Sequence, residues 1–122
     1  MKSNRGKNTS PEVMLRLALA RAGVKGYRLH LKDVPGRPDI AFPKSKLAVF
    51  VNGCFWHRCP ECNLRIPKTH REFWKKKFEL NQERDKRMVD EATSAGWRVL
   101  TIWEHEVKKD LAGCVMRIKR VL

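Results

Sequence analysis

Three cysteines lie close together in the sequence, at Cys54, Cys59 and Cys62. Clustered cysteines in a reducing compartment are more often metal ligands than disulfides, and their thiolates bind zinc well. His105, just after the strand-like segment WRVLTIW, can supply a fourth ligand. Three thiolates and one imidazole leave no position for water, so this set predicts a structural zinc site rather than a catalytic one.

Two alternatives to this ligand set stay open from the sequence alone. The cysteines could be unligated buried residues with His105 on the surface, although their close spacing argues against this. His57, three residues beyond Cys54, could replace His105 as the fourth ligand. The remaining cysteine is expected to be a small buried hydrophobic residue, and the remaining histidines carry no signal: Cys114, His30 and His70.

A carboxylate and an imidazole follow two neighbouring strand-like segments. Asp39 begins the strand in GRPDIAF, where its carboxylate can project from the sheet edge toward solvent, and LAVFVN leads toward His57. Phosphodiester hydrolysis needs Mg²⁺ to neutralise developing charge and a base to activate water, and Asp39 and His57 could provide these functions. Asp39 could instead be a turn or capping residue. Glu12, in the first turn of the first expected helix, could simply interact with the helix dipole.

The charge of the chain indicates a polyanionic partner, with nucleic acid as the leading candidate. The 122 residues include 27 Lys+Arg and 13 Asp+Glu, a formal net charge of +14. Such a field attracts polyanions over a Debye length. The length and a hydrophobic content of 42% predict a single domain over residues 1–122. No apolar run approaches the roughly 20 residues that span a bilayer, and a signal peptide is lacking, so we expect a cytoplasmic protein without membrane contact.

The elements that must position these residues can be predicted along the chain. Residues 1–9 are polar and basic and are expected to form a flexible arm. A helix is predicted from Ser10, as its N-cap, to Gly23, as its stop. A long helix is predicted to open with a capping box between Thr69 and Glu72. The expected elements after the first helix are strands at 27–31, 38–42 and 47–52, a helix at 69–95, a buried strand at 97–103 and a helix at 106–121. This order predicts a mixed sheet with helices packed on its faces.

Four segments, in this order and spacing, resemble the very-short-patch-repair (Vsr) endonucleases: GRPDIAF, LAVFVNGCFWH, REFWKKK followed by N and RD, and GWRVLTIWE. The match runs from about Gly6 to Glu106, and GCFWH is its most specific part. The resemblance implies a restriction-endonuclease-like α/β fold, in which a mixed sheet is flanked by helices. It also implies Mg²⁺-dependent cleavage of double-stranded DNA on the 5′ side of the thymidine at a T:G mismatch. By the same analogy the protein is a monomer, and mismatch-repair proteins are candidate partners.

The resemblance also implies roles for individual residues. Asp39 matches the family's metal-binding aspartate, and the backbone carbonyl of Val51 falls where the family supplies a second Mg²⁺ ligand. His57 matches the histidine that assists water activation, and Glu12 matches a helix glutamate near the active site. The four zinc ligands fall at or near the family's structural zinc positions.

Aromatic rings are implied in recognition of the mismatch. Phe55, Trp56 and Trp74 correspond to rings that wedge between base pairs, where a mismatched step costs less to unstack than a paired one. Trp74, Lys77 and Asn81 stand at i, i+3 and i+7, hence on one helix face, and the matching lysine and asparagine of the family lie at the mismatch. The three rings could instead be ordinary core residues.

Some features depart from better-known members of that family. From the resemblance we expect a shorter N-terminal arm than in those members, and Asn52 occupies a position where a histidine or aspartate is expected. His105 replaces a cysteine found in some relatives, although a Cys3His shell remains chemically competent. Two other functions stay open: a nuclease of the same fold that cuts paired DNA in restriction or defence, and a non-catalytic zinc-stabilised DNA-binding module in which Asp39 is structural.

Overall fold

The computed structural model describes residues 10–32, 34, 36–59, 62 and 65–122, apart from the side chains of Phe55 and Trp56. The arm expected over residues 1–9 therefore lies outside the described residues. Among the described helices, none combines the length and the apolar composition needed to cross a membrane.

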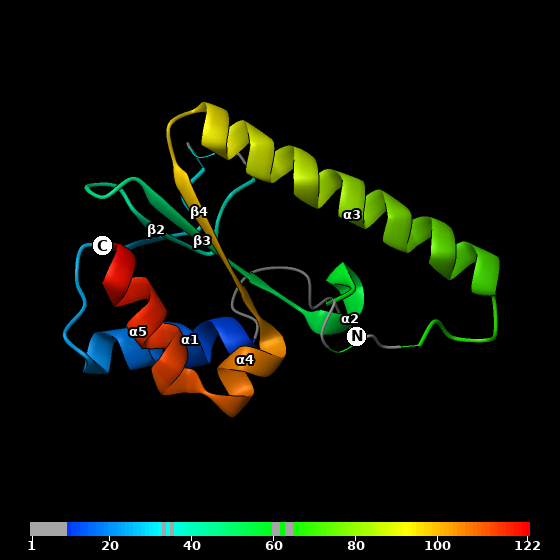
Figure 1. Cartoon of the computed structure of the whole chain (residues 1–122), viewed down its shortest axis with the longest axis horizontal. Helices are drawn as coiled ribbons and strands as arrows, with labels where there is room; N and C mark the ends of the chain where they lie inside the picture. Colours follow the sequence, from blue (N-terminus) through cyan, green and yellow to red (C-terminus); the bar gives the residue numbers. More distant parts are fainter. Residues whose placement is uncertain (1–9, 33, 35, 60–61, 63–64) are drawn as a thin grey trace.

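A four-stranded mixed sheet in the order β1-β2-β3-β4 forms the centre of the fold (Figure 1). β1 (Arg28–Leu29), β2 (Ile40–Phe42) and β3 (Leu47–Asn52) are antiparallel neighbours, whereas β4 (Arg98–Trp103) is parallel to β3. Parallel strands need a long crossover, which here contains α2 (Cys54–His57) and α3 (Arg71–Ser94). The carboxyl ends of β3 and β4 therefore lie side by side at one end of the sheet.

Helices cover both faces of this sheet, as the sequence predicts. α1 (Ser10–Arg21), α4 (Glu104–Lys109) and α5 (Leu111–Val121) pack together on one face, and α3 lies on the other (Figure 1). Side chains alternate along β3, so Leu47 and Val49 enter the larger core under α1 and α5, while Ala48 meets Ala92 of α3 in a smaller one. The N-terminal half of α3 extends past the sheet toward α2 (Figure 1).

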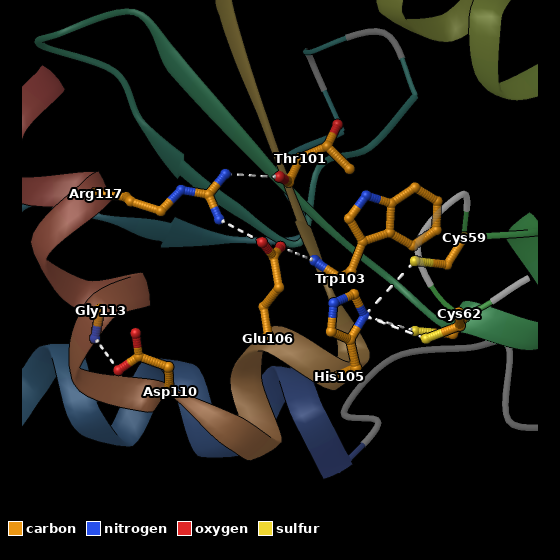
Figure 2. Close-up of polar contacts among 10 residues, drawn as sticks. Cys59, Cys62, Thr101, Trp103, His105, Glu106, Asp110, Gly113 and Arg117 are labelled. Atoms are coloured by element: carbon orange, nitrogen blue, oxygen red, sulfur yellow. Dashed lines mark hydrogen bonds and ion pairs between the residues drawn. The ribbon is translucent and has the colours of Figure 1, made fainter.

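Two expected helix features are wrong. The helix expected over 106–121 is divided at Asp110, whose backbone is non-helical and whose carboxylate accepts the N–H of Gly113 at 3.0 Å to cap α5 (Figure 2). The capping box between Thr69 and Glu72 does not form. α3 begins after His70, which has a left-handed backbone with φ 58° and makes no side-chain cap hydrogen bond.

The strands also differ from expectation in two respects. β1 is shorter than the expected strand because His30, directly after it, has a left-handed backbone with φ 51°. β4 was expected to be buried, yet it is an edge strand in which Ile102 alone is buried. β3 has the expected bounds, and Cys114 is 2% exposed in the larger core, as predicted for a small hydrophobic residue.

Candidate active site and metal centre

The four predicted zinc ligands lie together beyond the ends of β3 and β4. Nδ1 of His105 is 3.4 Å from Sγ of Cys54. It is 3.5 Å from Sγ of Cys59 and 3.4 Å from Sγ of Cys62 (Figure 2). Zn–S bonds of about 2.3 Å and Zn–N bonds of about 2.0–2.1 Å place such atoms roughly 3.6 Å apart in a tetrahedral shell. The three near-equal distances therefore fit a zinc site, and His105, rather than His57, is its imidazole.

The register of the sheet explains how ligands so distant in sequence meet. Cys54 and His105 are 51 positions apart, as are Asn52 and Trp103, which are paired across the parallel strands. Cys54 and His105 thus each lie two residues beyond a paired position, Cys54 at the start of α2 and His105 at the start of α4. The backbone N–H of Cys54 also donates to Oε1 of Glu104 at 3.2 Å, which ties α2 to α4.

The electrostatics of the cluster favour a cation. Burial raises the pKa of the Cys54 thiol to about 12, a hydrogen bond from the backbone of His105 lowers it, and the adjacent Cys62 and Cys59 raise it. A thiol that coordinates zinc is deprotonated by the charge of the ion, which reverses this effect. The donor set and its spacing are therefore those of a metal site rather than of a free thiolate.

Asp39 stands directly before β2 and is fixed by β3. Its carboxylate accepts the backbone N–H of Val51 at 2.7 Å. The register that pairs Ile40 with Val49 would place Pro38 opposite Val51, and proline has no N–H to donate to the Val51 carbonyl. Because the N–H and C=O of a strand residue face the same neighbouring strand, that carbonyl is directed toward the side on which Asp39 stands.

Contrary to expectation, the Asp39 carboxylate does not project into solvent. Burial raises the pKa of its carboxyl from 3.8 to about 7, and Glu12 raises it further, while the N–H of Val51 and, more weakly, His57 lower it. A group whose ionised form is disfavoured by burial gains most from a nearby cation. The carboxylate is thus suited to an ion more than to a surface turn.

Glu12 projects from α1 to the same place and is fully buried, with 0% of its side chain exposed. One ligand atom of Glu12, of His30 and of Asp39 can be chosen so that all three lie within 4.8 Å of one another. Interaction with the helix dipole alone does not account for this burial. No role was assigned to His30 from the sequence, yet it lies beside Asp39 because the antiparallel pairing of β1 with β2 continues to these two residues.

His57 is held by a residue that sequence reasoning missed. Its Nδ1 lies 2.5 Å from Oδ2 of Asp85, on α3. A carboxylate at Nδ1 favours the proton on that nitrogen and leaves Nε2 to accept another. The signal was present, because Asp85 follows Asn81 by four residues and so lies on the same helix face.

The predicted DNA-contacting face of α3 is partly occupied within the chain. The ring of Trp74 is half-buried and stacks on Phe78, with centroids 5.7 Å apart. Arg58 in turn covers Phe78, with its guanidinium carbon 4.3 Å from the ring centroid. Lys77 is exposed, and Asn81 accepts a hydrogen bond from Arg84 at 3.1 Å. Phe55 and Trp56 lie in α2, but their side chains are outside the described part of the chain, so their contact with DNA stays a prediction.

Comparison with known proteins decides the family. Residues 1–64 match the family model for the DNA mismatch endonuclease Vsr. The chain belongs to the Vsr family. It is 44% identical to the type II nicking enzyme V.NaeI of Lentzea aerocolonigenes, over 95% of this chain and 72% of that protein. V.XorIIP of Xanthomonas oryzae pv. oryzae, also a type II nicking enzyme, is 41% identical over 100% of this chain and 88% of its own length. The DNA mismatch endonuclease Vsr of Escherichia coli K12 is 36% identical over 80% of this chain and 62% of its own length.

Membership of the Vsr family makes the chain a DNA endonuclease, and hence a hydrolase of phosphodiester bonds that acts on DNA. The observed mixed sheet flanked by helices, with its zinc-ligand cluster, agrees with the fold that the resemblance implies. Asn52, the position that departs from the expected Vsr pattern, ends β3 and is half-buried. The roles of the individual site residues stay predictions.

Proposed function

We propose that this Vsr-family endonuclease nicks one strand of double-stranded DNA on the 5′ side of the thymidine at a T:G mismatch, in a Mg²⁺-dependent reaction. The observation that carries the proposal is the Asp39 carboxylate, held at 2.7 Å by the N–H of Val51. Two oxygen donors, that carboxylate and the Val51 carbonyl, thus face one place. The names of the relatives support nicking and mismatch recognition.

Asp39 and the Val51 carbonyl would hold the Mg²⁺, since oxygen donors are the ligands this ion prefers. When bound, Mg²⁺ neutralises charge that develops on the phosphate. His57, oriented by Asp85 at 2.5 Å, accepts a proton from the attacking water at Nε2. Glu12, buried beside Asp39, adds negative charge that favours retention of a cation.

Recognition of the mismatch is assigned to α2 and α3, which pack against each other. Phe55, Trp56 and Trp74 are proposed to wedge beside the mismatched step, and Lys77 and Asn81 to contact its bases. The net charge of +14 supplies the sequence-independent attraction to phosphates. The zinc-ligand cluster at the start of α2 is proposed to hold one structural Zn²⁺ that keeps this wedge rigid.

The requirement for a T:G mismatch is tested with two end-labelled duplexes that differ only in carrying T:G or T:A at one position. We expect a nick 5′ of the mismatched T in Mg²⁺, no nick in EDTA, and an intact T:A duplex. Equal cutting of both duplexes would assign the chain to nucleases that cut paired DNA. Intact binding of both duplexes without cutting would favour a non-catalytic binding module. The monomeric state, the cytoplasmic location and recruitment by mismatch-repair proteins stay predictions.

A further inference from the structure

Arg58 occupies a backbone position that usually belongs to glycine. It follows His57, the last residue of α2, and has a left-handed backbone with φ 54°. The N–H of Cys59 donates to the carbonyl of Cys54 at 3.0 Å, which is the bond that closes a Schellman motif at the end of a helix. Glycine dominates the left-handed position of this motif because a side chain is unfavourable there. An arginine that persists at this position despite the cost is expected to serve a site through its side chain.

The side chain of Arg58 contacts the aromatic stack of α3. Its guanidinium carbon lies 4.3 Å from the ring centroid of Phe78, which is a cation–π contact. Phe78 is 4% exposed, so its ring is a fixed part of the interior rather than a surface group. The centroids of Phe78 and Trp74 are 5.7 Å apart and their planes differ by 29°. Arg58 thus joins the end of α2 to a stack of rings on α3.

The end of α2 therefore contacts α3 at two points, through consecutive residues. Nδ1 of His57 lies 2.5 Å from Oδ2 of Asp85, and Arg58 lies over Phe78. Phe78 and Asp85 share one face of α3 and are about two helical turns, or roughly 10 Å, apart. A single hydrogen bond would let α2 pivot about the imidazole, whereas a second contact two turns away opposes this rotation. α2 has only 4 residues, so its own helical hydrogen bonds hold it weakly.

We propose that Arg58 is a positioning residue for His57: by stacking on Phe78 it fixes the end of α2 against α3 and keeps the imidazole on Asp85. The inference rests on the proposed function for the task of His57 in proton transfer, but the contact itself is a property of the protein without DNA. Arginine suits this role because its planar guanidinium stacks on a ring face, which the ammonium of lysine does less well. The competing role for Arg58 is an ion pair with a DNA phosphate.

The test follows the Nδ1 proton of His57 by NMR, in the full zinc-loaded chain without DNA. A proton held between His57 and Asp85 gives a downfield signal that exchanges slowly with water, and its loss in His57→Gln assigns it. Arg58→Met keeps an apolar stem but lacks the guanidinium, so we expect it to speed this exchange by about 10-fold or more. Single-turnover nicking of a T:G duplex should slow by about 10-fold, with duplex affinity within about 2-fold of the wild type. Arg58→Lys keeps the charge but not the planar stack, and should also speed the exchange.

Matched variants separate the stack from contacts with DNA. Phe78→Leu changes a buried ring and should reproduce the effects of Arg58→Met. The double variant should be no worse than either single one, because both remove the same contact. Arg58→Asn suits the left-handed backbone, relieves its strain and keeps the test available if Phe78→Leu fails to fold, with full zinc content as the sign of folding. Arg21→Met makes the same charge change at an exposed arginine at the end of α1, and should alter neither exchange nor nicking.

The outcomes distinguish this inference from its competitor and from the proposed function. Unchanged exchange in Arg58→Met, or a wild type without the protected signal, would overturn the inference. Unchanged exchange together with lower duplex affinity and a weaker salt dependence would assign Arg58 to a phosphate instead. A chain whose exchange responds to Arg58→Met but that fails to nick a T:G duplex in Mg²⁺ would retain this inference and lose the proposed function. A chain that nicks the duplex but whose exchange does not respond would do the reverse.

Discussion

Cys54 and His105 meet because they extend a parallel strand pair by the same two residues beyond Asn52 and Trp103. The sheet register and the ligand cluster are thus one structural unit. Zinc bound at this cluster would hold the carboxyl ends of β3 and β4 together, and Val51 lies near the carboxyl end of β3. Stability and activity should therefore both depend on the metal.

Removal of a zinc ligand is expected to unfold the region around the carboxyl ends of β3 and β4. His105→Ala should bind less than one zinc per chain and lose about 3 kcal/mol or more of the free energy of unfolding. Metal analysis and chemical denaturation measure the two effects. Cys114→Ala is the matched control, because this cysteine is buried in the core and lies outside the cluster. Full zinc content in His105→Ala would contradict the assignment.

Asp85 is expected to act through His57 rather than on DNA. Replacing it by Asn removes the charge that holds Nδ1 of His57 at 2.5 Å and allows the wrong tautomer. We predict a fall of about 10-fold or more in the single-turnover rate on a T:G duplex, with unchanged DNA affinity and thermal stability. Asp90→Asn, an exposed aspartate on the same helix, should leave the rate unchanged. A loss of affinity without a loss of rate would show that Asp85 serves binding instead.

The raised pKa of Asp39 predicts how stability depends on pH in the absence of Mg²⁺. The pKa of the Asp39 carboxyl is about 7 in the folded chain and ordinarily 3.8. Between these pH values the folded chain therefore binds more protons than the unfolded chain. The free energy of unfolding of the wild type should therefore fall as pH rises from about 4 to about 7. Asp39→Asn keeps an oxygen for the N–H of Val51 but has no charge to bury.

Asp39→Asn should consequently be more stable than the wild type by about 1–3 kcal/mol above pH 7, and should lose this advantage below pH 4. Urea denaturation of both zinc-loaded proteins at pH 4, 6 and 8 measures the difference. A difference that does not change with pH would show that Asp39 is not buried as an ionisable group.

Lys77 and Lys76 are adjacent exposed lysines on different faces of α3. Lys77→Ala is expected to reduce the preference for T:G over T:A by about 1–3 kcal/mol, because Lys77 shares its face with Asn81 and Trp74. Lys76→Ala should weaken binding of both duplexes equally and reduce the salt dependence. Competition binding at two salt concentrations measures both effects. Equal behaviour of the two variants would remove the mismatch contact from Lys77.

Most of the fold can be predicted from local patterns in the sequence. The apolar run at 47–52 predicts β3, and the close spacing of the three cysteines predicts their part of the zinc site, because both patterns depend on neighbours in sequence. His30 and Asp85 were missed because their roles depend on strand register and helix phase, which join residues from separate elements. The break at Asp110 was missed because a single side-chain cap outweighed the amphipathic pattern.

The central claim is that Asp39 is the catalytic metal-binding carboxylate of a mismatch nuclease. The most direct measurement compares wild type and Asp39→Ala on one labelled T:G duplex, with cleavage and binding followed in parallel in Mg²⁺. The account predicts loss of nicking by about 100-fold or more with duplex affinity retained. Nicking by Asp39→Ala at the rate of the wild type would contradict it.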